Sequence, residues 1–164
     1  MASNTLQNYE QLSYGGPGLS IHRAKAFQIV GDAVATRTLT LKESGGVFQM
    51  DSAAGVVYTL PTPVAGATYR FITTTSITSN ASKIITNLAT EFLLGEVFAY
   101  TTATASGAGF AANGTTIRAL SSNGTTTGGL IGDDYTVTAI SATVWFISGV
   151  TVGSGTLATP FATS

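Results

Sequence analysis

The feature that most constrains the fold is a series of short runs in which apolar and polar residues alternate. Val56, Tyr58 and Leu60 alternate with Val57 and Thr59. Other runs share this pattern or a β-branched and aromatic composition: residues 38–41, 69–74, 135–140 and 143–150. A period of two residues is typical of a strand with one buried face. These runs therefore predict many short β-strands.

Turn residues separate the runs, and they include Gly45-Gly46, Pro61-Thr62-Pro63, Asn113-Gly114, Asn123-Gly124 and Gly128-Gly129. Asn-Gly and Gly-Gly pairs favour tight turns between strands. Short strands with a turn about every ten residues indicate a β-sandwich or barrel. We therefore predict an all-β fold: a single antiparallel β-sandwich or barrel-like domain, similar to a jelly roll.

The chain has 164 residues, a length that fits one domain. We assign residues 35–164 to the β domain and residues 1–34 to an extended N-terminal arm, because "SYGGPG" favours open chain. Residues 20–33 fit helical and strand spacing, and we favour an extended segment. Residues 90–100 fit a short helix or a wide strand. The Ala, Gly, Ser and Thr run of residues 101–114 predicts a long loop.

Charge is scarce in this chain. Only 9% of residues are charged and the net charge is −1, against about 25% charged in ordinary soluble domains. Such a chain is more typical of an assembly component than of a freely diffusing enzyme. The scattered basic residues predict no direct nucleic-acid partner. We also expect no membrane partner and no signal peptide, despite a mean hydropathy of +0.32.

Few residues offer chemistry, and we predict no enzyme and no cofactor. Cysteine is absent and His22 is the one histidine, so a catalytic triad or a zinc site lacks its usual groups. The adjacent carboxylates Asp133 and Asp134 fit turn chemistry, with a calcium site as the alternative. Glu91 and Glu96 fit a solvated pair better than an acid/base pair.

Trp145 and Phe146 stand side by side in a predicted strand. Neighbouring strand residues point to opposite faces, so one of the two belongs in the core. The other fits a platform for stacking on a sugar.

Two segments carry a resemblance to known proteins. Residues 38–72, "TLTLKESGGVFQMDSAAGVVYTLPTPVAGATYRFI", resemble a module that recurs in tailed-bacteriophage virion proteins, and residues 131–150, "IGDDYTVTAISATVWFISGV", are similar to its closing hairpin. The resemblance covers residues 36–152. The module occurs in capsid decoration (cement) proteins and in longer tail-fibre proteins. This short chain, which holds one module and no repetitive shaft, is more similar to the decoration proteins.

The resemblance implies a non-enzymatic virion protein, made in the host cytoplasm and placed on the outer capsid surface. Its implied partners are the major capsid protein and other copies of itself, as a trimer. The clamp would hold adjacent capsid subunits of the expanded head against the pressure of packaged DNA. The hypothetical capsid or protomer contacts are Tyr9, Leu12, Tyr14, Leu157 and Phe161. The alternatives are a tail-fibre or receptor-binding module that contacts host glycans around Trp145, and a hydrolase that uses Glu91.

Overall fold

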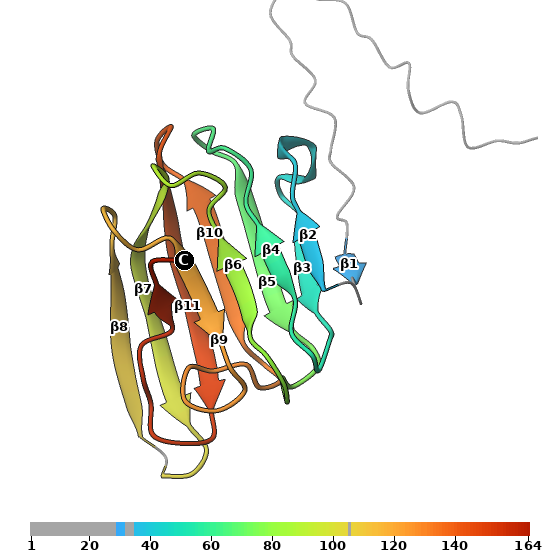
Figure 1. Ribbon diagram of the computed structural model, residues 1–164, viewed down its shortest axis with the longest axis vertical. Helices are drawn as coiled ribbons and strands as arrows, with labels where there is room; N and C mark the ends of the chain where they lie inside the picture. Colours follow the sequence, from blue (N-terminus) through green and yellow to red (C-terminus); the bar gives the residue numbers. More distant parts are fainter. Residues whose placement is uncertain (1–28, 32–34, 105) are drawn as a thin grey trace, which may run out of the picture.

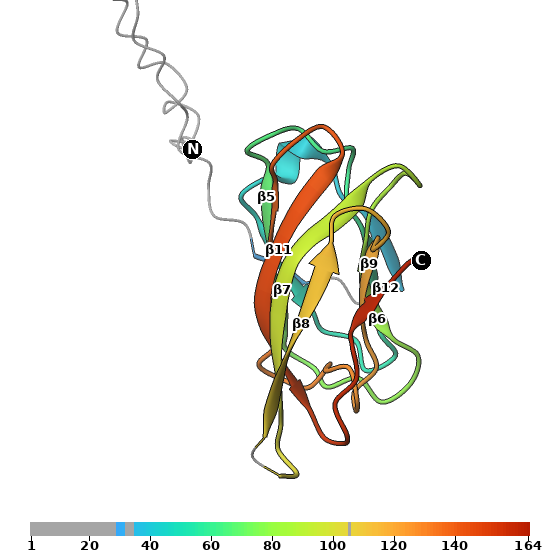
Figure 2. The ribbon, with the colours of Figure 1, turned by 90° about the vertical axis from the view of Figure 1, so that its left-hand side faces the viewer.

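The computed structural model describes residues 29–31, 35–104 and 106–164, and its regular secondary structure is almost entirely β-strand. Two sheets pack face to face (Figures 1 and 2). Among the described residues, one sheet has seven strands in the order β1-β3-β5-β10-β11-β7-β8 and the other has five in the order β12-β9-β6-β4-β2. The predicted all-β sandwich is confirmed.

The seven-stranded sheet is made of the following strands: β1 (Ile29–Gly31), β3 (Val47–Met50), β5 (Thr68–Thr73), β7 (Phe92–Thr101), β8 (Gly107–Asn113), β10 (Asp134–Ala139) and β11 (Val144–Gly153). The five-stranded sheet is made of these strands: β2 (Thr36–Thr38), β4 (Val57–Thr59), β6 (Ser82–Ile85), β9 (Ala119–Ser122) and β12 (Phe161–Ala162). A short 3-10 helix, η2 (Leu41–Glu43), stands where the sequence predicted the end of a strand.

The two sheets are mixed, whereas the sequence predicted antiparallel pairing. From β1 to β6 the chain crosses to the opposite sheet after every strand. Because the chain visits the other sheet between two strands of the same sheet, those two strands run in the same direction. The strands β1, β3 and β5 are therefore parallel neighbours in one sheet, and β2, β4 and β6 are parallel neighbours in the other. β7 and β11 are also parallel, while the hairpins β7–β8 and β10–β11 are antiparallel. A jelly roll, which is built of antiparallel strands, is therefore the wrong topology.

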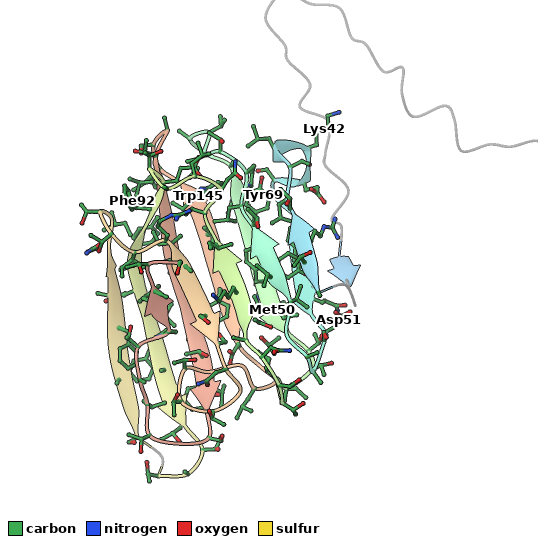
Figure 3. The ribbon with its side chains drawn as sticks, viewed as in Figure 1. Lys42, Met50, Asp51, Tyr69, Phe92 and Trp145 are labelled. Atoms are coloured by element: carbon green, nitrogen blue, oxygen red, sulfur yellow. The ribbon has the colours of Figure 1, made fainter. Side chains whose placement is uncertain are left out.

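The core lies between the sheets and is rich in aromatic rings. Phe48 lies 5.8 Å from Tyr58 and 5.6 Å from Phe71, measured between ring centroids. Tyr69 lies 5.7 Å from Trp145, and Figure 3 shows these two side chains near one end of the sandwich. All five rings are at most 1% exposed. The alternation of buried and exposed residues predicted from residues 56–60 and 69–74 is the alternation that fills this core.

Two less regular segments settle the alternatives that the sequence left open. Residues 92–101 form the long strand β7, so the strand and not the helix is present. Residues 107–113, predicted to be loop, form β8, because they pair along β7 from Tyr100↔Gly107 to Leu94↔Asn113.

Most of the predicted arm lies outside the described residues, which leave out 1–28 and 32–34. The described residues of that segment form β1, which pairs with β3. No helix in the described ranges is both long and apolar enough to cross a membrane.

Candidate interaction surface

The outer face of the seven-stranded sheet carries large apolar side chains on β7 and β11. Leu94, Phe98 and Tyr100 of β7 and Phe146 and Val150 of β11 are all exposed, with Phe98 the most open at 52%. The register places Phe146 beside Leu94 and Val150 beside Phe98. Outward-facing residues alternate with core residues along each strand, so these side chains share one face. We call these five residues the apolar face.

The strand β8 extends the apolar face to the edge of the sheet. Within the described residues β8 has one strand neighbour, β7, so its other side is a free edge. The sequence of β8, "GAGFAAN", contains no charged residue and no proline. Charges and prolines are the usual devices that stop an edge strand from pairing with another chain. This edge therefore lacks the usual protection against association.

A shallow hollow of about 260 Å³ lies in the middle of the apolar face, and its lining includes Glu96, Phe98, Gly109 and Ser148. The hollow forms because the residues paired with Glu96 on the adjacent strands, Ala111 and Ser148, have small side chains. Glu96 makes no ion pair or side-chain hydrogen bond with any other described residue. The apolar face thus surrounds one unpaired carboxylate.

The neighbouring half of the same sheet surface is polar and internally paired. Arg70 of β5 donates from Nε and Nη2 to the two carboxylate oxygens of Asp134 at 2.9 and 2.5 Å. This ion pair is exposed to solvent, so it contributes little to stability. Its charges satisfy one another and leave the apolar half as the side that lacks a partner.

Gly95 allows β7 to approach β11 closely beneath the apolar face. Its φ is +128°, and a Cβ atom built there would lie 2.1 Å from the carbonyl oxygen of Ile147. Gly109 on β8 has no atom within 4 Å of such a Cβ position. Gly95 is therefore required by geometry and Gly109 is not.

We expect Gly95→Ala to lower the free energy of unfolding by roughly 2 kcal/mol or more, because the methyl group meets backbone that cannot move aside. Gly109→Ala is the matched control and should change it by less than about 0.5 kcal/mol. Urea denaturation followed by circular dichroism measures both. Equal midpoints for the two variants would contradict the close approach.

Asp133 and Asp134, adjacent in sequence, have opposite surroundings. Asp133 is fully buried, and its carboxylate accepts hydrogen bonds from the backbone N–H groups of Gly129 and Val152, each at 2.7 Å. The hydroxyls of Tyr135 and Thr151 donate to the same carboxylate at 2.8 and 2.7 Å. Burial raises the pKa of Asp133, and these four hydrogen bonds oppose the rise.

The network extends to the second sheet, because the Tyr135 hydroxyl lies 3.1 Å from that of Ser122 on β9. Asp133 is therefore an interior anchor. The described residues contain no group of three or more His, Cys, Asp or Glu side chains that could hold a metal ion.

The other carboxylates singled out in the sequence do not form a pair. Glu91 is buried, and its Oε2 accepts hydrogen bonds from the backbone N–H groups of Asn87 and Leu88, each at 3.1 Å. Glu96 lies on the outer face of β7. One carboxylate caps an internal turn while the other faces out, so the two do not share a site.

Trp145 is not a surface platform. Its side chain is fully buried beside Tyr69, whereas Phe146 is 41% exposed on the opposite face. One of the two residues is in the core, as the strand geometry predicted, and it is the tryptophan. A glycan site built on Trp145 is therefore wrong for this fold.

The residues predicted to contact the capsid or another protomer differ in burial and position. Phe161 of β12 belongs to the core and is 7% exposed, so burial removes its side chain from the contact set. Leu157 is half-buried and lines an open hollow with Thr101 and Ala108 at the end of the β7–β8 hairpin. Tyr9, Leu12, Tyr14 and His22 lie outside the described residues.

Comparison of the chain with protein-family models, with curated proteins and with solved structures found no match.

Proposed function

We propose that this protein is a non-enzymatic structural component of a tailed-bacteriophage virion. In this role it binds the outer surface of the expanded capsid as a homo-oligomer, a trimer, and clamps adjacent major capsid subunits against the pressure of packaged DNA. The observation that carries an assembly role is the apolar face beside the uncharged free edge of β8. Exposed apolar patches of this kind mark sites of protein association.

The choice of a virion rests on the resemblance of residues 36–152, which run from β2 to β11 and so include most of the sandwich. The mechanism needs no chemical step. A protein that binds the expanded lattice more tightly than the unexpanded one stabilises the expanded state by that difference in binding free energy. A trimer suits a threefold position on the lattice because its symmetry is closed.

The test is co-sedimentation of the purified protein with expanded capsids stripped of accessory proteins. Unexpanded proheads and isolated tails are the controls. We expect saturable binding to expanded shells alone, with a stoichiometry that matches a symmetry axis. Binding to tails instead would favour the alternative, a tail-fibre or receptor-binding module that contacts host glycans, and binding to neither shell would overturn the proposal.

We further expect shell binding to persist at high salt, because the chain has few charges with which to form ionic contacts. At ~1 M salt, electrostatic interactions are screened beyond about 3 Å, while burial of apolar surface is retained. Co-sedimentation at ~0.1 M and ~1 M salt measures this. Loss of binding at modest ionic strength would mean that ion pairs dominate the contact.

A further inference from the structure

A partner that binds the apolar face must also carry a positively charged side chain. Its five side chains are each between 37% and 52% exposed, and they surround Glu96. A partner that buries this face also buries the Glu96 carboxylate. A buried carboxylate without a cation is strongly unfavourable. The partner must therefore combine apolar side chains with a lysine or an arginine.

Most of the lysine and arginine side chains in the described part of the chain already have a hydrogen-bond or ion-pair partner. Arg37 pairs with Glu43 and Arg70 with Asp134. Arg118 donates to Thr86, and Lys83 donates to the carbonyl oxygen of Ser164. Lys42 on η2 makes no ion pair with a carboxylate in the described residues. Its exposed apolar neighbour in the sequence is the single residue Leu41.

The remaining cations are Arg23 and Lys25, in residues 1–28. The sequence of this segment also holds apolar and aromatic residues: Tyr9, Leu12, Tyr14 and Phe27. It therefore has the composition that the apolar face requires. Lys25 and Phe27 are two residues apart, the spacing that places two side chains on the same side of an extended chain.

The width of the sheet limits how Lys25 can reach Glu96 of its own chain. The paired positions Ile29↔Val47, Val47↔Arg70, Arg70↔Thr136, Thr136↔Ser148 and Ser148↔Glu96 form one row across the sheet. Ile29 and Glu96 are thus five strand spacings apart, which is about 24 Å. Lys25 precedes Ile29 by four residues, which span at most ~14 Å when fully extended. Even along the straightest path the backbone at Lys25 therefore stops about 10 Å short of Glu96. A contact within one copy would require residues 25–28 and both side chains to be fully extended across the sheet, at right angles to β1.

We propose that residues 1–28 of one copy bind the apolar face of a neighbouring copy, with Lys25 paired to that copy's Glu96. The first strand β1 and the free edge strand β8 are the two edges of the seven-stranded sheet. The contact brings the β1 edge of one copy beside the β8 edge of the next. Such a head-to-tail interface closes into a ring when its rotation allows. The inference deepens the oligomer of the proposed function and does not depend on capsid binding.

The first test is a charge reversal in the full chain, with mass measured by light scattering after size exclusion. We expect Lys25→Glu and Glu96→Lys each to raise the dissociation constant of the oligomer roughly 30-fold or more, and the double variant to restore association. Lys42→Glu is the charge-matched control and should leave the oligomer intact. A monomeric wild type, insensitivity to both single variants, a failure of the double variant to restore, or an equal loss from Lys42→Glu would overturn the proposal.

The second test separates contact between copies from contact within one copy. The chain has no cysteine, so Lys25→Cys with Glu96→Cys places one cysteine on each side of the proposed contact. We expect oxidation to give covalent dimers and trimers on a non-reducing gel. An internally linked monomer, or no linkage at all, would overturn the proposal. Both tests are made without capsids, so a failure of shell binding with an intact oligomer would count against the proposed function alone.

Discussion

Asp133→Asn is expected to lower the free energy of unfolding by at least roughly 1–3 kcal/mol, the cost of each buried donor left unpaired. All four groups that contact the carboxylate donate hydrogen bonds: the N–H groups of Gly129 and Val152 and the hydroxyls of Tyr135 and Thr151. An asparagine offers one oxygen in place of two, and its amide group is itself a donor. At least one backbone N–H then lacks an acceptor.

The neighbouring residue provides the matched control. Asp134 is exposed and pairs only with Arg70 in the described part of the chain, so Asp134→Asn should cost far less than Asp133→Asn. The two variants make the same chemical change one residue apart. Urea denaturation measures the difference, and equal losses would mean that the buried network does not stabilise the fold.

The same comparison has a pH dependence of known sign. Burial raises the pKa of Asp133 above its ordinary value of 3.8. A group whose pKa is higher in the folded chain stabilises the fold fully below its unfolded pKa, and that contribution declines as pH rises through the folded pKa. The stability difference between the wild type and Asp133→Asn should therefore be larger at acid pH than at neutral pH. A difference that does not change with pH would mean that folding leaves this pKa unaltered.

The sequence predicts the strands of this protein better than their order. The alternation around Tyr58 and Phe71 identifies two core strands because a period of two residues survives any sheet topology. The same pattern carries no information about which sheet a strand joins. The crossing of the chain between sheets, and hence the parallel pairs, was for that reason not predicted.

The strand β8 was missed because its signal is weak. Glycine and alanine dominate its seven residues, and both are uncommon in strands. Its place is determined by pairing with β7 over its whole length, a non-local interaction that local propensity cannot reveal.

The apolar face has a signal in the sequence of β7, where apolar residues occupy both sides of the strand. In β7, "FLLGEVFAYT", Leu93 and Val97 fill the core while Leu94 and Phe98 face outward. A strand that is apolar on both faces is typical of a sheet that is covered on both sides. Asp133 could not be recognised in the same way, because an Asp-Asp pair before a strand has the composition of an ordinary turn.

Trp145→Ala is expected to have the largest effect of any single core truncation, with a loss of roughly 3–5 kcal/mol in the free energy of unfolding. The indole is fully buried and contacts Tyr69 at 5.7 Å between ring centroids. Removal of the indole takes away buried apolar surface and leaves a cavity between the two sheets. Ile140→Ala in the same hairpin is the control, because Ile140 is 50% exposed and should cost less than about 1 kcal/mol.

A second substitution separates the packing of Trp145 from its polarity. Its Nε1 is buried with no hydrogen-bond partner in the described residues, so Trp145→Phe removes an unsatisfied donor while it keeps an aromatic ring. We expect this variant to retain much of the stability that Trp145→Ala loses, because a smaller cavity is partly offset by the donor removed. Thermal unfolding of Trp145→Ala, Trp145→Phe and Ile140→Ala ranks the three variants by stability. If Trp145→Ala proved as stable as the wild type, the tryptophan would not be a core residue, and a glycan platform at this strand would have to be considered again.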